Sequence, residues 1–176
     1  METSNICIRT NPKYDHIVRH LGYTPVDEIP DNTGIYRKDT ELIGESQQKL
    51  SQVKVIPDEQ LSSGQLSALS LIRAINDRNA RASGIFAAVI PAASDRVRTA
   101  GLYGRHDKKI HMSTDQLNSL WAAINTGIHE MAHHISGAED GLQEHDEQIT
   151  TLSKTIIEQV SNGDYDIYLK NPELAW

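Results

Sequence analysis

The sequence is poor in several residue types, and each shortage excludes a class of protein. Its 176 residues include one cysteine, Cys7, so the chain can form neither an internal disulfide nor a zinc site built from two or four cysteines. Aromatic residues make up 5% of the chain, and Phe86 is the single phenylalanine, which predicts a core of aliphatic side chains. Among metal-binding side chains, the eight histidines therefore become the ones to follow.

Long apolar runs and an excess of positive charge are also missing. No stretch approaches the roughly 18 consecutive apolar residues of a membrane-spanning helix. Residues 1–9 contain Glu2 and no long apolar run, so we expect no secretory signal peptide and a cytoplasmic location. The chain has 17 basic and 24 acidic residues and a net charge of −7, which disfavours binding to nucleic acid through its phosphates. Nothing in the sequence indicates an oligomeric state.

The distribution of prolines and glycines divides the chain into two parts. The total length is typical of one domain, with room for an extension. Closely spaced breaker residues interrupt residues 1–50, which we interpret as an irregular N-terminal extension with a short strand over 6–8 and a short helix over 14–21. Residues 51–176 are then expected to form the folded domain.

Apolar residues recur at three- and four-residue spacing in three segments, which predicts three helices. The first covers residues 60–79, with Asp58 as its N-cap, and Gly64 leaves open a start nearer Ser63. The second opens at Ser113 or Thr114 and ends at Gly137, and the third covers about residues 142–160. The second helix carries an apolar stripe that we expect to face the core: Leu117, Leu120, Trp121, Ile124, Ile128, Met131 and Ile135.

Strands are predicted between the first and second helices. The apolar run over residues 84–90 is typical of a buried strand, and residues 98–104 and 109–112 are two further candidates joined by a loop. Gly101 and Gly104 favour an edge strand that another backbone can approach. Helices and strands together predict an α+β fold.

The second predicted helix contains the motif H-E-x-x-H, from His129 to His133. Residues i and i+4 lie about 40° apart around a helix, so both imidazoles can reach one zinc ion. Glu130 lies beside that face, where it can hydrogen-bond a metal-held water rather than bind the metal. A chain of this length and composition is expected to contain only about 0.02 such motifs by chance. We therefore interpret the motif as a metal site.

The motif also carries a family resemblance. The segment Thr126-Gly-Ile-His-Glu-Met-Ala-His-His-Ile135 is similar to the active-site motif of zincin metallopeptidases. The order of elements over residues 58–160 also resembles the zincin order of helix, strands, active-site helix and third-ligand helix. The resemblance implies a minimal zincin-like domain of the small cytosolic type, with Zn²⁺ as cofactor. Residues 1–50 have no counterpart in it.

A third metal ligand must come from outside the motif, because catalytic zinc commonly takes three protein ligands and one water. The metzincin subgroup has Gly and His at positions that hold Ser136 and Glu139 here, which argues against that subgroup. The apolar stripe of the third helix, extended backward, places His145 and Asp146 on its inward side. We predict His145 as the third ligand. The open alternatives are Asp146, Asp140 and Glu144.

These residues predict a zinc-dependent metallopeptidase acting on a protein or peptide substrate. His129, His133 and His145 hold the metal, and Glu130 is the general base that activates a water. The substrate is expected to lie extended along the strand near residues 101–104. The alternative is a non-catalytic, zinc-containing protein-binding module that keeps a zincin shell. The presence of Glu130 argues against it, because a helix flank gives this carboxylate no structural role.

Other side chains around the predicted cleft remain candidates for a supporting role. His134, His106, His111 and Tyr103 can each donate a hydrogen bond to a tetrahedral intermediate, although each also suits an ordinary helix, strand or loop position. Basic residues around the hairpin can attract an acidic segment or protect the edge strand from aggregation. They are Arg96, Arg98, Arg105, Lys108 and Lys109.

Overall fold

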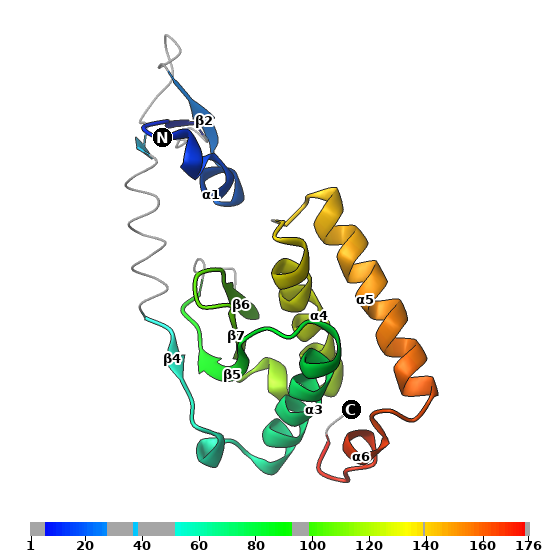
Figure 1. The fold of residues 1–176 in the computed structure, drawn as a ribbon. Coiled ribbons are helices and arrows are strands. Elements are labelled where there is room, and N and C mark those ends of the chain that lie inside the picture. Colours follow the sequence, from blue (N-terminus) through cyan, green and yellow to red (C-terminus); the bar gives the residue numbers. More distant parts are fainter. Residues whose placement is uncertain (1–5, 28–36, 39–51, 93–98, 139, 175–176) are drawn as a thin grey trace. The chain divides into compact units, whose positions relative to one another are not determined.

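The structure is a computed structural model that describes residues 6–27, 37–38, 52–92, 99–138 and 140–174. It divides into two units, Met1–Gln52 and Val53–Trp176 (Figure 1). Helices and small sheets occur together, so the chain is an α+β protein, as the sequence predicts. Among the described residues, no helix has both the length and the apolar character needed to cross a membrane.

The first unit contains a short parallel sheet with the order β2-β1-β3. Its described elements are strand β1 (Ile6–Ile8), the 3₁₀ helix η1 (Pro12–Tyr14), helix α1 (Asp15–His20), strand β2 (Thr24–Val26) and strand β3 (Arg37–Lys38). Cys7 and Val18 are fully buried and form a small core, against which Tyr23 packs. The short strand and helix expected from the sequence are therefore present in this unit.

The second unit is built around a four-stranded sheet with the order β4-β5-β7-β6. Its elements are strand β4 (Lys54–Val55), 3₁₀ helix η2 (Asp58–Gln60), helix α3 (Ser63–Asn79), strands β5 (Gly84–Val89), β6 (Gly101–Gly104) and β7 (Lys109–Ser113), 3₁₀ helix η3 (Gln116–Asn118), and helices α4 (Leu120–Ser136), α5 (Gln143–Ser161) and α6 (Asp166–Leu169). Strands β5 and β7 are parallel, whereas β4 and β6 run antiparallel to their neighbours. In this order of strands, β6 is an edge.

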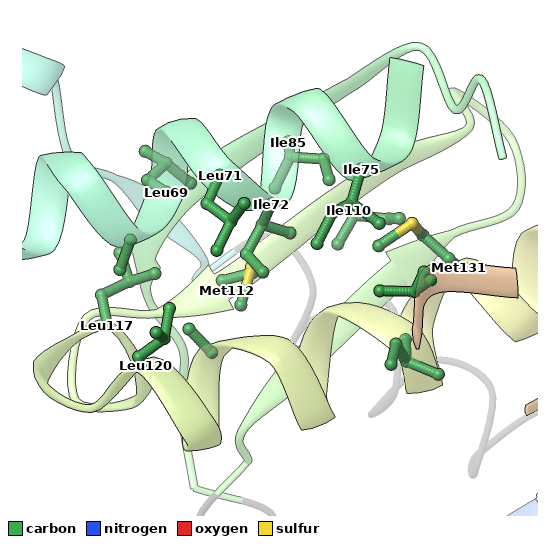
Figure 2. Close-up of a cluster of buried hydrophobic side chains, with 14 of the residues drawn as sticks. Leu69, Leu71, Ile72, Ile75, Ile85, Ile110, Met112, Leu117, Leu120 and Met131 are labelled. Atoms are coloured by element: carbon green, nitrogen blue, oxygen red, sulfur yellow. The ribbon is translucent and has the colours of Figure 1, made fainter. Parts of the chain in front are cut away.

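The main core lies where α3, α4 and one face of this sheet meet. Ile85 and Ala87 of β5 and Ile110 and Met112 of β7 alternate along their strands and are almost fully buried. Figure 2 shows aliphatic side chains of α3, the strands and α4 converging in one cluster. The expectation of an aliphatic core is confirmed for the residues that the structure describes. This core fixes α4 against the sheet and so positions the residues of the H-E-x-x-H motif.

Helix α3 begins where Ser62 caps it, not at Asp58. The Ser62 hydroxyl accepts a hydrogen bond from the Gln65 backbone N–H, and the Gln65 side chain accepts one from the Ser62 N–H, which forms a capping box. Asp58 instead accepts two hydrogen bonds from the guanidinium of Arg73, at 2.6 and 3.0 Å. The predicted cap was wrong because this carboxylate finds a stronger partner in the tertiary structure.

Helix α4 starts later than the sequence predicts. Ser113 is the last residue of β7, and its N–H donates to the carbonyl of Ala100, while the N–H of Thr114 donates to Ala88. These bonds continue the sheet as far as Thr114, so the chain is still extended where the helix was predicted to open. The helix begins at Leu120, after the short turn η3.

Most of the predicted stripe is buried as expected: Leu117, Leu120, Ile128 and Met131 lie in the core. Trp121 and Ile135 were expected in the core but are 65% and 40% exposed. An added Cβ atom on Gly127 would lie 2.8 Å from Ile72 Cγ2, so α4 passes close to α3 at this residue. Small residues permit close helix packing, and the fully buried Ala123 lies one turn before Gly127.

Helix α5 packs along α4, and the tail folds back onto the domain. Leu152 and Ile156 of α5 are buried, whereas Leu142 and Val160 near its two ends are 48% and 41% exposed. Tyr165 is buried, and its hydroxyl donates to the Gln159 side chain at 2.5 Å.

Candidate metal centre

Helix α4 presents the two histidines of the motif on one side, close to its C-terminal end. The Nε2 atoms of His129 and His133 lie 3.2 Å apart, and the ring centroids are 4.8 Å apart. Gly137 ends the helix with a φ of 66°, a left-handed conformation that favours glycine. The chain can therefore turn back toward the two imidazoles immediately after the helix.

Helix α5 brings His145 to the same point. Its side chain is 2% exposed, and its ring stacks on that of His133 with centroids 4.1 Å apart. The ring centroid of His129 is 4.8 Å away. The predicted third ligand therefore does meet the two histidines of the motif in space.

Asp140, one of the open alternatives, lies at the centre of this group. Its Oδ1 atom is 3.0 Å from His129 Nε2, 3.1 Å from His133 Nε2 and 3.9 Å from His145 Nδ1. Together the four side chains offer one donor atom each, all within 4.8 Å of one another. This set can hold a metal ion, although three imidazoles and a carboxylate are not specific to zinc.

Backbone carbonyls orient two of the imidazoles. His133 Nδ1 lies 2.9 Å from the Ala138 carbonyl oxygen, and His145 Nε2 lies 3.4 Å from the carbonyl oxygen of His129. A carbonyl oxygen only accepts, so these nitrogens carry the protons, and the opposite nitrogens direct lone pairs toward Asp140. Hydrogen bonds of this kind fix the tautomer of metal-binding histidines in many proteins.

The arrangement places lone pairs against one another unless a cation lies among them. His133 Nε2 and Asp140 Oδ1, both acceptors in this tautomer, are 3.1 Å apart. Burial lowers the pKa of His129, and its effect exceeds the opposing effect of the Asp140 carboxylate, so a proton on that ring is disfavoured. The donor set therefore fits a bound metal cation better than a protonated histidine cluster.

Glu130 is buried beside this cluster, under the edge strand. Its side chain lies so close to Gly101 of β6 that an added Cβ atom there would be 2.7 Å from Glu130 Oε1. The pKa of Glu130 is raised to about 8, chiefly by burial and secondarily by the charge of Asp140, while a hydrogen bond from the Tyr103 backbone opposes the rise. A carboxyl group with such a pKa can exchange a proton near neutral pH.

The proposed supporting residues occupy different places. The Tyr103 hydroxyl lies 2.9 Å from His134 Nδ1, and His134 also hydrogen-bonds to the backbone of Ala80, so these side chains join β6, α4 and the end of α3. His111 Nδ1 is buried and has no hydrogen-bond partner among the described residues, while its ring stacks on Phe86. These contacts involve none of the four clustered donors.

Two of the alternative ligands point elsewhere. Asp146 was expected to face inward, but its side chain is 71% exposed, with Oδ1 3.9 Å from His145 Nδ1. Glu144 is also exposed and does not join the cluster. Both residues follow Leu142 in the exposed first turn of α5, in which only His145 is turned into the protein.

The basic hairpin residues contribute to structure near the site. Arg105 donates a hydrogen bond to the carbonyl of Gly137 at 2.9 Å, which ties the β6–β7 loop to the end of α4. The Lys109 ammonium lies 3.4 Å from Asp107. Arg96 and Arg98 lie outside the described residues, so the full basic cluster expected from the sequence is not defined.

Sequence reasoning missed how the cluster is completed. Asp140 was only an alternative, although it follows the helix-ending Gly137 by three residues. The metzincin pattern has Gly and His at the positions of Ser136 and Glu139. In this structure the helix-ending glycine is Gly137 and the acidic donor is Asp140, each one residue later than in that pattern. The Tyr103 N–H and the Ala138 carbonyl are backbone groups, which no side-chain motif can reveal.

Comparison with known proteins adds no relative. No protein-family model matches the chain, and neither the curated proteins nor the solved structures contain a match. The chemical interpretation therefore depends on the geometry of the residues themselves.

Proposed function

We propose that this protein is a zinc-dependent metallopeptidase of the zincin type. The observation that carries the proposal is the convergence of His129, His133 and His145 from two helices, with Glu130 buried beside them against an edge strand. A purely structural metal site needs the donors but has no use for an adjacent buried carboxylate and an accessible strand edge.

The nitrogen-rich donor set suits zinc, for which imidazole is a preferred ligand. When bound, zinc lowers the pKa of its water to about 7 and polarises a substrate carbonyl. The protein's part is to hold the imidazoles in place, through the carbonyls of Ala138 and His129 and through the packing of α4 against α5.

Glu130 is the proposed general base. Its carboxylate takes a proton from the attacking water and then gives that proton to the leaving nitrogen of the cleaved peptide bond. The Glu130 side chain is confined between Gly101 and Thr126. An added Cβ atom on Gly101 would lie 2.7 Å from Glu130 Oε1 and 2.7 Å from Thr126 Cγ2. This confinement keeps the carboxylate directed toward one place during the reaction.

Strand β6 offers an edge on which an extended peptide can bind. The Ser113 N–H donates to Ala100, so in this antiparallel pair Leu102 faces β7, and Gly101 and Tyr103 direct their backbone groups to the open edge. The hydrogen bond from Tyr103 to Glu130 agrees with that direction. Because Glu130 already accepts from the Tyr103 N–H, a peptide would pair with Gly101 and with the Tyr103 carbonyl, and it would pass next to Glu130.

A non-catalytic protein-binding module with a bound zinc is the second candidate. The position of Asp140 favours it, because four protein ligands are typical of structural zinc sites. The two candidates differ in their dependence on Glu130. If the protein is a peptidase, loss of the Glu130 carboxylate abolishes activity and leaves the metal bound. If it is a binding module, loss of the carboxylate leaves its function unchanged.

The test is peptide cleavage by the zinc-loaded protein. We expect the wild-type chain to cleave members of a random peptide library, with products identified by mass spectrometry. E130Q should keep one zinc per chain and the wild-type circular dichroism spectrum, and should lose at least about 100-fold in cleavage rate. Cleavage that persists in E130Q, or wild-type protein that holds zinc and cleaves nothing, contradicts the proposal.

The remaining expectations belong to the same proposal. We place the protein in the cytoplasm, with a protein or peptide as its substrate and no role for nucleic acid. Cell fractionation checks the location, and electrophoretic mobility of labelled DNA and RNA checks for nucleic-acid binding.

A further inference from the structure

The cluster has one more metal-binding side chain than a catalytic zinc site needs. Catalytic sites take three protein ligands and leave a position for water, whereas structural sites take four. In a tetrahedral zinc site the ligand atoms are roughly 3.3 Å apart. Asp140 Oδ1 lies 3.0 and 3.1 Å from the Nε2 atoms of His129 and His133, so its carboxylate stands where a fourth ligand would be.

The four donors are not held equally firmly. All three histidines belong to the helices α4 and α5; the side chains of His133 and His145 are 11% and 2% exposed, and that of His129 is 40% exposed but is carried by the middle of α4. Asp140 lies in a turn, its side chain is 49% exposed, and the next residue is Gly141 with a φ of 76°. The carboxylate can therefore leave the cluster by a local change, whereas moving a histidine disturbs a helix.

Backbone hydrogen bonds also hold the histidines more firmly than Asp140. His133 is held by the Ala138 carbonyl and His145 approaches the carbonyl of His129, so two imidazoles keep their orientation without help from Asp140. Arg105 fixes the carbonyl of Gly137, which anchors the start of the turn and leaves the movement to the part around Asp140 and Gly141.

We propose that Asp140 is a displaceable fourth ligand that occupies the water position of the metal in the resting protein and leaves it to permit hydrolysis. The inference rests on the proposed metal site and adds a means of regulating it. With Asp140 bound, one carboxylate neutralises part of the metal charge and no position is open. With Asp140 displaced, three neutral imidazoles remain and a water can bind.

The proposal predicts how a small metal-binding inhibitor behaves. Acetohydroxamate needs the position that Asp140 occupies, so its apparent affinity falls by the fraction of molecules in which that position is open. If the open fraction is about a tenth or less, removal of the carboxylate tightens acetohydroxamate binding by about tenfold or more. The metal itself should bind more weakly in the variant, because one donor is lost.

The experiment uses the full chain loaded with Co²⁺, whose visible absorption reports the ligands directly. D140A and D140N are compared with the wild type and with D146A, which removes a carboxylate from the exposed first turn of α5. In the wild type and D146A we expect the same spectrum and weak acetohydroxamate binding. In D140A and D140N we expect one Co²⁺ per chain, a shifted spectrum and tighter acetohydroxamate binding. D140N controls for folding because it keeps the side-chain shape.

Each other outcome overturns a defined part of the account. Identical spectra and inhibitor affinities in the wild type and D140A show that Asp140 is not a ligand, while the three-histidine site survives. Loss of Co²⁺ from both D140A and D140N, with their fold intact, shows a permanent ligand rather than a displaceable one. A wild-type protein that binds no Co²⁺ or Zn²⁺ removes the proposed function and this inference together.

Discussion

Gly101 controls the position of Glu130, the proposed general base, because any side chain at this residue collides with Glu130 and Thr126. A Cβ atom there would lie 2.7 Å from Glu130 Oε1 and from Thr126 Cγ2. The threonine is β-branched and sits in a helix, so the glutamate must move. We expect G101A to lower kcat for peptide cleavage at least tenfold with zinc content unchanged, and to cost about 1–3 kcal/mol of stability. Metal analysis and steady-state kinetics check this.

A second glycine in the same strand provides the control. A Cβ atom on Gly104 would meet the carboxylate of Asp107, an exposed side chain in the hairpin loop that can turn away. G104A should therefore keep most of the wild-type kcat. Equal activity in G101A and the wild type would show that the close contact with Glu130 has no role in catalysis.

Glu130 also makes the metal-free protein sensitive to pH. Its pKa is raised to about 8 in the folded state from an ordinary value of 4.5, so folding favours the protonated form. This contribution is fully present below pH 4.5 and is lost as the pH rises through about 8. We expect the unfolding free energy of metal-free E130Q, relative to wild type, to rise by about 2–4 kcal/mol between pH 4.5 and pH 9. Urea unfolding measures it, and a pH-independent difference would show that Glu130 is not buried in its neutral form.

Single residues also show what a sequence can reveal. The spacing of His129, Glu130 and His133 follows from the helix repeat, so the sequence alone indicates that they share a face. Asp140 reaches the cluster only because Gly137 turns the chain in a left-handed conformation. The glycine predicts the helix end, but the path of the chain after it, which includes the bond from Arg105 to the Gly137 carbonyl, is not contained in a local pattern.

Among the elements, α3 is tied to its surroundings by Arg73. Its guanidinium donates to both oxygens of Asp58 and to the carbonyl of Ile85, which joins η2, α3 and β5. The hydrogen bonds from Arg73 lower the pKa of Asp58 below its ordinary value of 3.8. The ion pair therefore stabilises the fold above that pH, and its contribution is lost as the pH falls through the lower folded value.

We expect D58N to destabilise the protein at pH 7 by about 0.5–1 kcal/mol, because both partners are partly exposed to solvent. The difference from wild type should shrink as the pH falls below about 4. Urea unfolding of both proteins at a series of pH values from 7 down to about 2.5 tests this. A difference that stays constant over this range would mean that the charge of Asp58 does not contribute.

The same elements show why some boundaries can be read from the sequence and others cannot. The core of α3 and the span of α5 follow from apolar spacing and lie close to their predicted ranges. The start of α4 does not, because the backbone of Ser113 and Thr114 is used by the sheet. Most of the buried face of α4 follows from apolar spacing, but Trp121 and Ile135 are exposed, and a pattern of large apolar residues does not include Gly127, which lies close to Ile72.

In the molecule as a whole, the candidate metal site lies within one of the two units. All four clustered donors and Glu130 lie in Val53–Trp176, where the core holds α4 between α3, the sheet and α5. The α+β class could be predicted because helical and strand periodicities both occur in the sequence. The β4-β5-β7-β6 order, which makes β6 an edge beside Glu130, comes from pairings between distant residues that periodicity does not specify.

The zinc content of two double variants tests the central claim most directly. H129A/H133A removes the two histidines of the motif, and H16A/H20A removes two other histidines with the same four-residue spacing, within α1. After dialysis against zinc and removal of loosely held metal, we predict one zinc per chain in the wild type and in H16A/H20A, and none in H129A/H133A. Stoichiometric zinc in folded H129A/H133A would contradict the account.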